Sequence, residues 1–292
     1  LAARPVRRKS RVGHGQAAGA PFGGYTARAA HEFAHVFQSP GPIYEPGGDC
    51  PAAHVANYHL QAGYDDTKAL ENFVNSADVV TYEFENIPTA ALDAIEAHRP
   101  IRPGREALRI SQDRLTEKTF LLDLGLATAP FAAVDDAESL IQAIDTIGFP
   151  AILKTRRFGY DGKGQARLAS PDDAGAALSA LQGAPAVLEG FVDFACEISV
   201  IAARGADGRV AAFDPGQNVH AGGILRTTTV PAALPGRVLI DAVLAAGKIL
   251  NTLDYIGVLG VEFFVTPGGL IVNEIAPRVH NSGHWTQNGC AV

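Results

Sequence analysis

A predicted β-hairpin near the end of the sequence constrains the fold more than any other feature. Residues 257–266 and 270–276 are rich in β-branched and aromatic side chains. They flank Pro267-Gly268-Gly269, a pattern that predicts two antiparallel strands joined by a three-residue loop. A loop of this length pairs residue 266 with residue 270.

The same register sets two carboxylates against each other. Residue 264 pairs with residue 272, and Glu262 lies directly opposite Glu274. Facing carboxylates on neighbouring strands repel unless a cation lies between them, although on an arbitrary hairpin such residues more often face water. Oxygen ligands that leave room for water and phosphate suit Mg²⁺ better than Zn²⁺. The hairpin therefore indicates a magnesium site.

A polar segment follows the second strand and favours the site over a solvated sheet face. Within eight residues and without apolar periodicity it carries Arg278, His280, Asn281, Ser282, His284 and Trp285. Such a segment is poor core material and is typical of a loop that binds anions.

Composition excludes several classes of protein. A chain of 292 residues, 47% of them hydrophobic, predicts a globular protein of two or three domains. The net charge of -7 argues against a nucleic-acid surface, so local Arg and Lys clusters must hold any anionic substrate. We expect neither a membrane span nor a secretory signal. The three cysteines have no metal-binding spacing and predict a reduced, cytoplasmic protein, while the absence of Met indicates a fragment.

Strands and helices alternate from Ile43 onward. Residues 43–104 predict a three-layer α/β domain, in which residues 78–84 form a buried strand. Residues 106–125 are strongly helical and stop at Gly125. Residues 1–42 show neither a convincing strand nor a helical stripe, and we interpret them as disordered or mistranslated.

Two further α/β blocks follow. The first has predicted strands at 131–134, 150–154, 165–169 and 185–189 and helices at 136–147 and 171–182. The second begins at Glu197 and has strands at 197–205 and 209–214, a helix at 236–253 and the hairpin. Between its strands and its helix, residues 218–226 form a predicted loop in which His220 and Arg226 accompany two glycines.

A glycine-rich segment at 159–165 is a candidate phosphate site. Three glycines between two predicted strands let backbone N–H groups turn toward a phosphate, and Lys154 at the end of the preceding strand can meet phosphate oxygens. An ordinary flexible hairpin is the alternative. The segment is not a Walker A loop, because no helix and no Gly-Lys-Ser/Thr follow.

The strand at 185–189 leads into a candidate adenine site. Glu189 is followed by an extended apolar segment that offers backbone groups to an adenine edge, with Phe191 or Val192 against the ring. Glu197 could accept ribose hydroxyls. The alternatives are an edge strand that leads to a linker, and a solvated glutamate.

Taken together, six segments resemble the ATP-grasp superfamily. Within it they resemble the 5-(carboxyamino)imidazole ribonucleotide synthases of purine biosynthesis, the ATPase subunit of phosphoribosylaminoimidazole carboxylase. The similarity runs from about Ile43 to Val292, and the last segment is the most specific. The segments are TYEFENIP (81–88), SQDRLTEK (111–118), ILKTRRFGYDGKGQ (152–165), LEGFVDFACEISVIAARG (188–205), NVHAGGILR (218–226) and VEFFVTPGGLIVNEIAPRVHNSGHWTQNG (261–289).

The resemblance implies an α/β fold, α+β in its nucleotide-binding part. A Rossmann-like pre-ATP-grasp domain would span 43–104 and an ATP-grasp domain 105–292, with a mobile lid at about 128–190. The family continues into a C-terminal domain that this sequence lacks, and it begins with a strand and a glycine turn that residues 1–42 do not show.

The resemblance also implies roles for individual residues. The nucleotide would be bound by Arg114, Lys154, Gly159, Tyr160, Asp161, Gly162, Lys163, Gly164, Gln165, Glu189, Gly190, Phe191, Val192, Glu197, His220, Asn273 and Glu274. Magnesium would be bound by Glu262 and Glu274. The ribonucleotide or bicarbonate would be held by Tyr160, Asp161, Arg278, His280, Asn281 and one of Glu83 and Glu85. The catalytic residues would be Lys154, Tyr160, Asp161 and Arg278.

The implied activity is that of a ligase. ATP and Mg²⁺ would drive carboxylation of 5-aminoimidazole ribonucleotide by bicarbonate, through carboxyphosphate, in a cytoplasmic homodimer that binds neither nucleic acid nor membranes. The alternatives are an ATP-grasp ligase with a different acceptor, a non-catalytic ATP-binding remnant, and a structural module.

Overall fold

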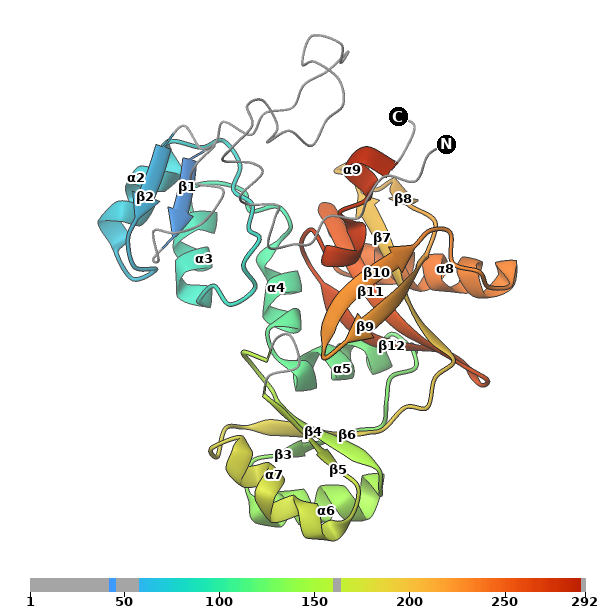
Figure 1. Ribbon diagram of the computed structural model, residues 1–292. Coiled ribbons are helices and arrows are strands. Elements are labelled where there is room, and N and C mark those ends of the chain that lie inside the picture. Colours follow the sequence, from blue (N-terminus) through green and yellow to red (C-terminus); the bar gives the residue numbers. More distant parts are fainter. Residues whose placement is uncertain (1–41, 46–57, 160–163, 290–292) are drawn as a thin grey trace. The chain divides into compact units, whose positions relative to one another are not determined.

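The computed structural model describes residues 42–45, 58–159 and 164–289 (Figure 1). The predicted atypical segment 1–42 therefore lies outside the described residues, apart from Pro42. The chain divides into two compact units: one consists of Leu1–Val80, Ala90–Pro100 and Asn288–Val292, and the other of Thr81–Thr89 and Ile101–Gln287.

The first unit combines strands and helices as predicted. Strand β1 (Pro42–Glu45) pairs in parallel with β2 (Tyr58–Gln61), and helices α2 (Thr67–Asn75) and α3 (Thr89–Glu96) follow. Asp66 begins α2 because its side chain accepts a hydrogen bond from the Ala69 N–H at 2.9 Å. This unit is the α/β part of the fold.

The strand predicted at 78–84 is wrong. The Val80 N–H donates to the Pro100 carbonyl at 2.9 Å and Val80 forms an isolated bridge, but no regular strand runs through these residues. The chain leaves the first unit after Val80 and enters the second at Thr81. A hydrophobic run becomes a strand only where another strand can pair with it along its length, and residues 78–84 do not stay beside one.

The helical segment at 106–125 forms two helices. These are α4 (Arg105–Ser111) and α5 (Arg114–Asp123). Asp113 separates them, because its carboxylate caps α5 by accepting hydrogen bonds from the backbone N–H groups of Leu115 and Thr116 at 3.0 and 3.1 Å. Gly125 has a φ of 68° just after α5, as expected for a helix stop.

A four-stranded antiparallel sheet forms the predicted first block. Its strand order is β3-β6-β4-β5, and helices α6 and α7 cover one of its faces (Figure 1). A short 3₁₀ turn, η4 (Pro171–Asp173), leads into α7. The other elements are β3 (Phe131–Val134), α6 (Ala137–Ile147), β4 (Ala151–Thr155), β5 (Gln165–Leu168), α7 (Ala174–Ala180) and β6 (Ala186–Gly190).

A six-stranded sheet forms the second block. Its order is β10-β9-β7-β11-β12, with β8 paired to β7. The predicted loop at 218–226 is instead a hairpin, because Gly222 and Gly223 both have positive φ and allow a two-residue turn. The elements are β7 (Cys196–Arg204), β8 (Val210–Ala212), β9 (Gly216–Ala221), β10 (Ile224–Thr229), α8 (Gly236–Thr252), β11 (Gly257–Thr266), β12 (Gly269–Ala276), η5 (Asn281–Gly283) and α9 (Thr286–Gly289).

A β-bulge corrects the predicted register of the β11–β12 hairpin. Thr266 pairs with Gly269 and Phe264 with Ile271, so the turn is one residue shorter than predicted. The register then shifts between Phe263 and Glu262, and this restores the predicted pairing of Glu262 with Glu274. Asn273 is the extra residue on β12, which lets two successive polar side chains lie opposite Glu262.

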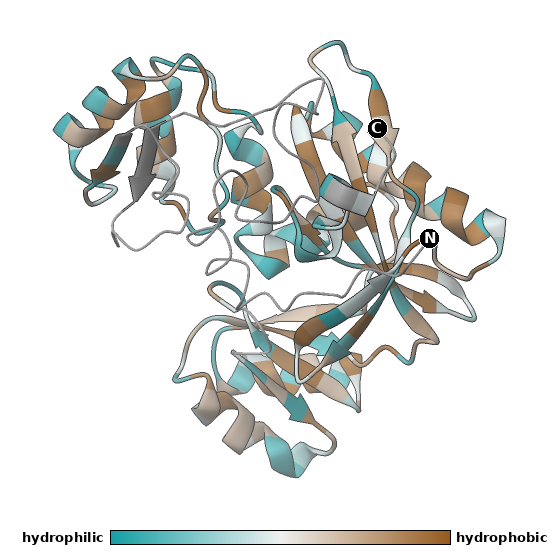
Figure 2. Ribbon diagram, turned by 45° about the horizontal axis from the view of Figure 1, so that its top comes forward, coloured by the Kyte–Doolittle hydropathy of each residue, from teal (hydrophilic) through white to brown (hydrophobic). Residues whose placement is uncertain are grey.

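The bulge also separates the core face of the sheet from its polar face. Val272 and Ile275 are both buried in the core although they are three residues apart, which strict alternation along a strand does not allow. On β11, Val261 and Phe263 face the same core, where α8 packs. The helices carry both hydrophobic and hydrophilic residues (Figure 2), as expected for helices that bury one side against a sheet.

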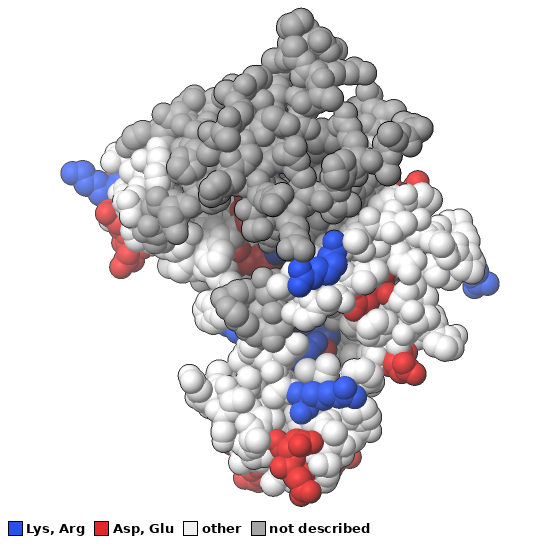
Figure 3. Space-filling model, in the orientation of Figure 1, with Lys and Arg blue, Asp and Glu red and all other residues white. Residues whose placement is uncertain are grey.

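Charges are mixed on the surface. The face of the molecule in Figure 3 shows Lys and Arg interspersed with Asp and Glu in the part that the structure describes. Among these described residues, none of the helices is both long and apolar enough to cross a membrane.

Glu117 ties α5 to β12. Its side chain is buried, and its Oε1 accepts a hydrogen bond from the Ile275 N–H at 2.6 Å. Burial, and next the nearby Glu274, raise the pKa of Glu117 to about 8. The carboxyl group is therefore mostly protonated at neutral pH.

Two leucines of α8 test where the core lies. Leu250 is completely buried, whereas Leu244 is 65% exposed. Leu250→Ala is expected to lower the free energy of unfolding by about 2–5 kcal/mol, because it leaves a cavity. Leu244→Ala should change it by less than about 0.5 kcal/mol. Denaturant titrations followed by circular dichroism measure both, and equal losses would contradict the assigned core.

Glu117 gives a prediction about pH and stability. Its pKa in the folded chain lies above its value in the unfolded chain, so the folded state binds the proton more tightly and loses this advantage as the pH rises from about 4.5 to 8. Glu117→Gln keeps a hydrogen-bond acceptor and does not titrate. The stability of the variant relative to the wild type should therefore rise with pH, by up to about 1.4 kcal/mol per unit. Thermal unfolding at several pH values tests this, and a constant difference would contradict it.

Candidate functional site

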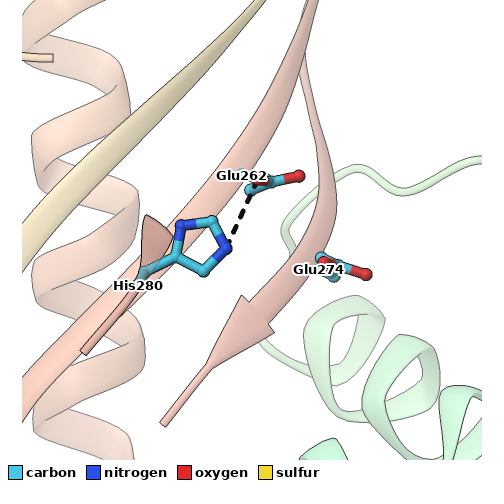
Figure 4. A group of neighbouring side chains, drawn as sticks. All are labelled: Glu262, Glu274 and His280. Carbon is cyan, nitrogen blue, oxygen red and sulfur yellow. Dashed lines mark ion pairs between the residues drawn. The ribbon is translucent and has the colours of Figure 1, made fainter. Parts of the chain in front are cut away.

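Glu262 and Glu274 lie side by side on the polar face of the large sheet (Figure 4). Burial, and next the repulsion of Glu274, raise the pKa of Glu262 to about 8. Burial alone would also raise the pKa of Glu274, but Arg114 and then His280 and Lys154 outweigh it and hold that pKa below its usual range. The pair therefore favours a single negative charge unless a cation joins it.

Three side chains could ligate that cation. One ligand atom each from Glu262, Glu274 and His280 lie within 4.8 Å of one another. His280 Nε2 is 3.5 Å from Glu262 Oε1, and Asn273 Nδ2 is 3.5 Å from Glu262 Oε2. The imidazole was predicted to bind substrate, and its position beside the carboxylates is not evident from the spacing of the residues.

His280 is held in place from two sides. Its Nδ1 lies 2.8 Å from Ser282 Oγ, and burial lowers the pKa of its imidazole to about 4, so the ring is neutral. A Cβ at Gly260 would lie 2.8 Å from the His280 Cβ, so only glycine leaves room for the ring there.

Two lysines share one buried carboxylate. Glu189 Oε2 is 2.9 Å from Lys154 Nζ and 3.1 Å from Lys118 Nζ. Burial would raise the pKa of Glu189, but the two lysines outweigh it and hold that pKa below its usual range. Its Oε1 is buried and has no hydrogen-bond partner among the described residues. The cluster has a net positive charge and an acceptor atom left for a ligand.

Lys118 was not predicted as a site residue. It lies in the SQDRLTEK segment, four residues after Arg114, so both side chains project from the same face of α5. Arg114 Nη1 is 3.5 Å from Glu274 Oε2. From helix α5, the Arg114 side chain therefore reaches the carboxylate pair and the Lys118 side chain reaches Glu189.

Glu197 and His220 are in contact on neighbouring strands of the large sheet. The hydrogen bond between the Glu197 carboxylate and His220 Nδ1 raises the pKa of the imidazole. Glu262 and Glu274 also raise it, which places His220 within electrostatic range of the carboxylate pair. The predicted ribose residues thus lie on the same sheet as the predicted magnesium ligands.

Arg278 pairs with Glu85. The distance from Arg278 Nε to Glu85 Oε1 is 2.9 Å, and both side chains are half-buried. Burial raises the pKa of Glu85, although Arg278 opposes the shift. Glu83 is exposed, so of the two glutamates it is Glu85 that lies against a predicted site residue. Asn281 begins η5 and is half-buried.

The glycine-rich segment is described only at its ends. Tyr160, Asp161, Gly162 and Lys163 lie outside the described residues. Gly164 has a φ of 69°, and a Cβ there would lie 2.6 Å from Thr155 Oγ1, so glycine is required at this position. Gly159 precedes the gap and Gln165 begins β5.

The predicted adenine segment uses part of its backbone in the fold. Gly190 N–H donates to the Pro130 carbonyl at 2.8 Å and Phe191 N–H to the Pro150 carbonyl at 3.0 Å. The Phe191 ring is 42% exposed, with the Arg167 guanidinium 4.8 Å from its centroid. Val192, which follows, is half-buried.

Comparisons with known proteins identify the family of this chain. Residues 119–292 match the ATP-grasp domain, and residues 19–112 match the ribonucleotide synthetase preATP-grasp domain. The N5-carboxyaminoimidazole ribonucleotide synthase of Brucella melitensis is 55% identical over 253 residues, which cover 86% of this chain and 70% of that protein.

Solved structures are similar as well. That of N5-carboxyaminoimidazole synthetase from Staphylococcus aureus, complexed with ADP, has a TM-score of 0.80 and 38% identity, over 84% of this chain and 66% of the other. That of the Aspergillus clavatus synthase, in complex with ADP and 5-aminoimidazole ribonucleotide, has a TM-score of 0.78 and 27% identity, over 86% and 66%. The chain belongs to the N5-carboxyaminoimidazole ribonucleotide synthase family of ATP-grasp ligases.

Proposed function

We propose that this chain carboxylates 5-aminoimidazole ribonucleotide with bicarbonate at the expense of ATP, forming N5-carboxyaminoimidazole ribonucleotide in purine biosynthesis. The observation that carries the proposal is that, in a chain of this family, a carboxylate pair lies within electrostatic range of two other charged groups. Glu274 of the pair interacts with Lys154 of the lysine pair around Glu189, and with Glu85 of the Arg278–Glu85 pair. Each group suits one part of the reaction.

The lysine cluster and Arg114 are suited to the phosphates of ATP. Lys154, Lys118 and Arg114 bring three cations to a largely buried region that holds Glu189 and Glu274. Such preorganised charges stabilise a transferring phosphoryl group. The proposed nucleotide contacts continue through Gly159, Gly164, Gln165, Glu189, Gly190, Phe191, Val192, Glu197, His220, Asn273 and Glu274.

The donor set fits magnesium. Glu262 and Glu274 supply carboxylate oxygens beside Asn273, and their mutual repulsion is relieved by a cation. Magnesium supplies charge neutralisation for the phosphates when it is bound. We propose Glu262 and Glu274 as its ligands.

The reaction has two steps. An oxygen of bicarbonate attacks the γ-phosphorus, the bond to the β-phosphate oxygen breaks, and ADP leaves carboxyphosphate behind. The amine of the ribonucleotide then attacks the carboxyl carbon, phosphate leaves, and the amine loses a proton. Arg278 orients the anion, and neutral His280 and Asn281 complete the acceptor side. Of the two candidate glutamates we assign Glu85 here, because it holds Arg278.

The proposed assembly and location follow from the family. We propose a homodimer on the basis of the family resemblance, and a cytoplasmic location because a free thiol such as that of Cys196 suits a reducing compartment. Sedimentation of the purified chain measures its mass in solution, and a monomer at working concentration would remove the dimer from the proposal.

Release of ADP tests the activity. With ATP, Mg²⁺ and bicarbonate present, we expect ADP release to require 5-aminoimidazole ribonucleotide and to yield its carboxylated product. Turnover with biotin or an amino acid in its place would indicate a ligase with a different acceptor. Binding of ATP without turnover for any acceptor would indicate a non-catalytic remnant.

Substitution of the carboxylates tests the metal assignment. Glu262→Gln and Glu274→Gln should each lower kcat/KM by about 10²-fold or more and raise the Mg²⁺ concentration for half-maximal rate, because each removes a charged ligand. Glu138→Gln, on the exposed face of α6, should change neither quantity. Initial rates over a Mg²⁺ series measure both, and wild-type values in both site variants would contradict the assignment.

A further inference from the structure

A single buried amide joins three segments of the second unit. Gln112 lies between α4 and α5 and is 6% exposed. Its Nε2 donates to the Glu85 carbonyl at 2.7 Å and to the Ile87 carbonyl at 2.8 Å. Its Oε1 accepts from Arg157 Nη2 at 2.8 Å. Both amide hydrogens are used and the oxygen faces a cation, so the amide cannot be turned over without losing all three bonds.

On one side, the Gln112 amide contacts the segment that carries Glu85, the partner of the proposed acceptor-binding residue Arg278. Residues 85–87 lie outside helices and strands, and the Gln112 side chain binds the carbonyls at both ends of this short segment. The same segment carries the Glu85 carboxylate, which is 2.9 Å from Arg278. The position of Glu85, and through it that of Arg278, therefore depends on Gln112.

The other end leads to the phosphate side. Arg157 follows β4, the strand that carries Lys154. The residue before it, Arg156, forms an ion pair with Asp113, which follows Gln112 between α4 and α5. The distance from Arg156 Nη2 to Asp113 Oδ2 is 2.8 Å. The Arg114 N–H also donates to the Arg156 carbonyl at 2.9 Å. The junction of α4 and α5 is thus fixed to the end of β4 at adjacent points.

We propose that Gln112 is a positioning residue for the acceptor substrate. It fixes the position of the Glu85–Arg278 pair relative to the phosphate-binding lysines. The inference rests on the proposed function, because it takes Arg278 to hold the acceptor. A residue that only supported the fold would affect both substrates alike. Gln112 contacts the backbone of the acceptor segment, so its loss acts mainly on the ribonucleotide.

Gln112→Glu is the sharpest variant. It keeps the size of the side chain and an acceptor for Arg157, but it turns an oxygen toward the carbonyls of Glu85 and Ile87. We expect KM and the dissociation constant for 5-aminoimidazole ribonucleotide to rise about tenfold or more, while KM for ATP stays within about twofold. Glu106→Gln, at an exposed position of α4, is the matched control and should change neither KM.

A double-mutant cycle shows whether Gln112 acts through Glu85. Glu85→Gln alone should also raise KM for the ribonucleotide, and adding Gln112→Glu should raise it by much less than the product of the single effects. If Gln112→Glu does not fold, an unchanged ribonucleotide KM in Glu85→Gln overturns the inference, because the path runs through that carboxylate.

The outcomes separate the inference from the proposed function. Calorimetry of ribonucleotide binding to the wild type comes first, and a wild type that neither binds nor turns over this substrate overturns both. If the wild type binds it, equal changes in the two KM values for Gln112→Glu, or fully additive effects in the cycle, overturn the role of Gln112 alone.

Discussion

The repulsion between two carboxylates on facing strands is the constraint on which the site depends. Glu262 and Glu274 are half-buried and close together, so ionising both of them at once costs free energy. A nearby positive charge is needed to offset that cost. Arg114 does this in part from α5. A divalent cation between the two carboxylates would complete the compensation, as proposed above for magnesium.

The bulge at Asn273 makes this arrangement compatible with a packed core. Without an extra residue, alternation would put Glu274 on the same face as Val272, which lies in the hydrophobic core. With it, two successive polar side chains face Glu262 while Val272 and Ile275 remain buried. The bulge therefore keeps the site carboxylate on the polar face of the sheet and the apolar side chains of β12 in the core. From helix α5, Arg114 and Glu117 reach β12 at Glu274 and Ile275, and Lys118 reaches Glu189 on β6.

Much of the fold and part of the site follow from local sequence patterns. The strands and helices of residues 131–276 were predicted closely, with the β9–β10 hairpin as the exception, because period-two and helical patterns are strong there and glycines mark the turns. The pairing of Glu262 with Glu274 was predicted for a partly wrong reason, since the turn was one residue shorter and a bulge compensated. Lys118 and the break at Asp113 were missed, because a helical pattern hides both a cap and a buried lysine that finds its partner 71 positions away. The false strand at 78–84 shows the same limit: a run of apolar residues does not reveal whether a neighbour will pair with it.

Gly260 is a position at which the site requires the absence of a side chain. It offers no functional group, yet any larger residue would collide with the His280 ring. Variation among natural sequences should therefore be as restricted at this strand position as at the acidic pair, although a survey based on ligand contacts would overlook it.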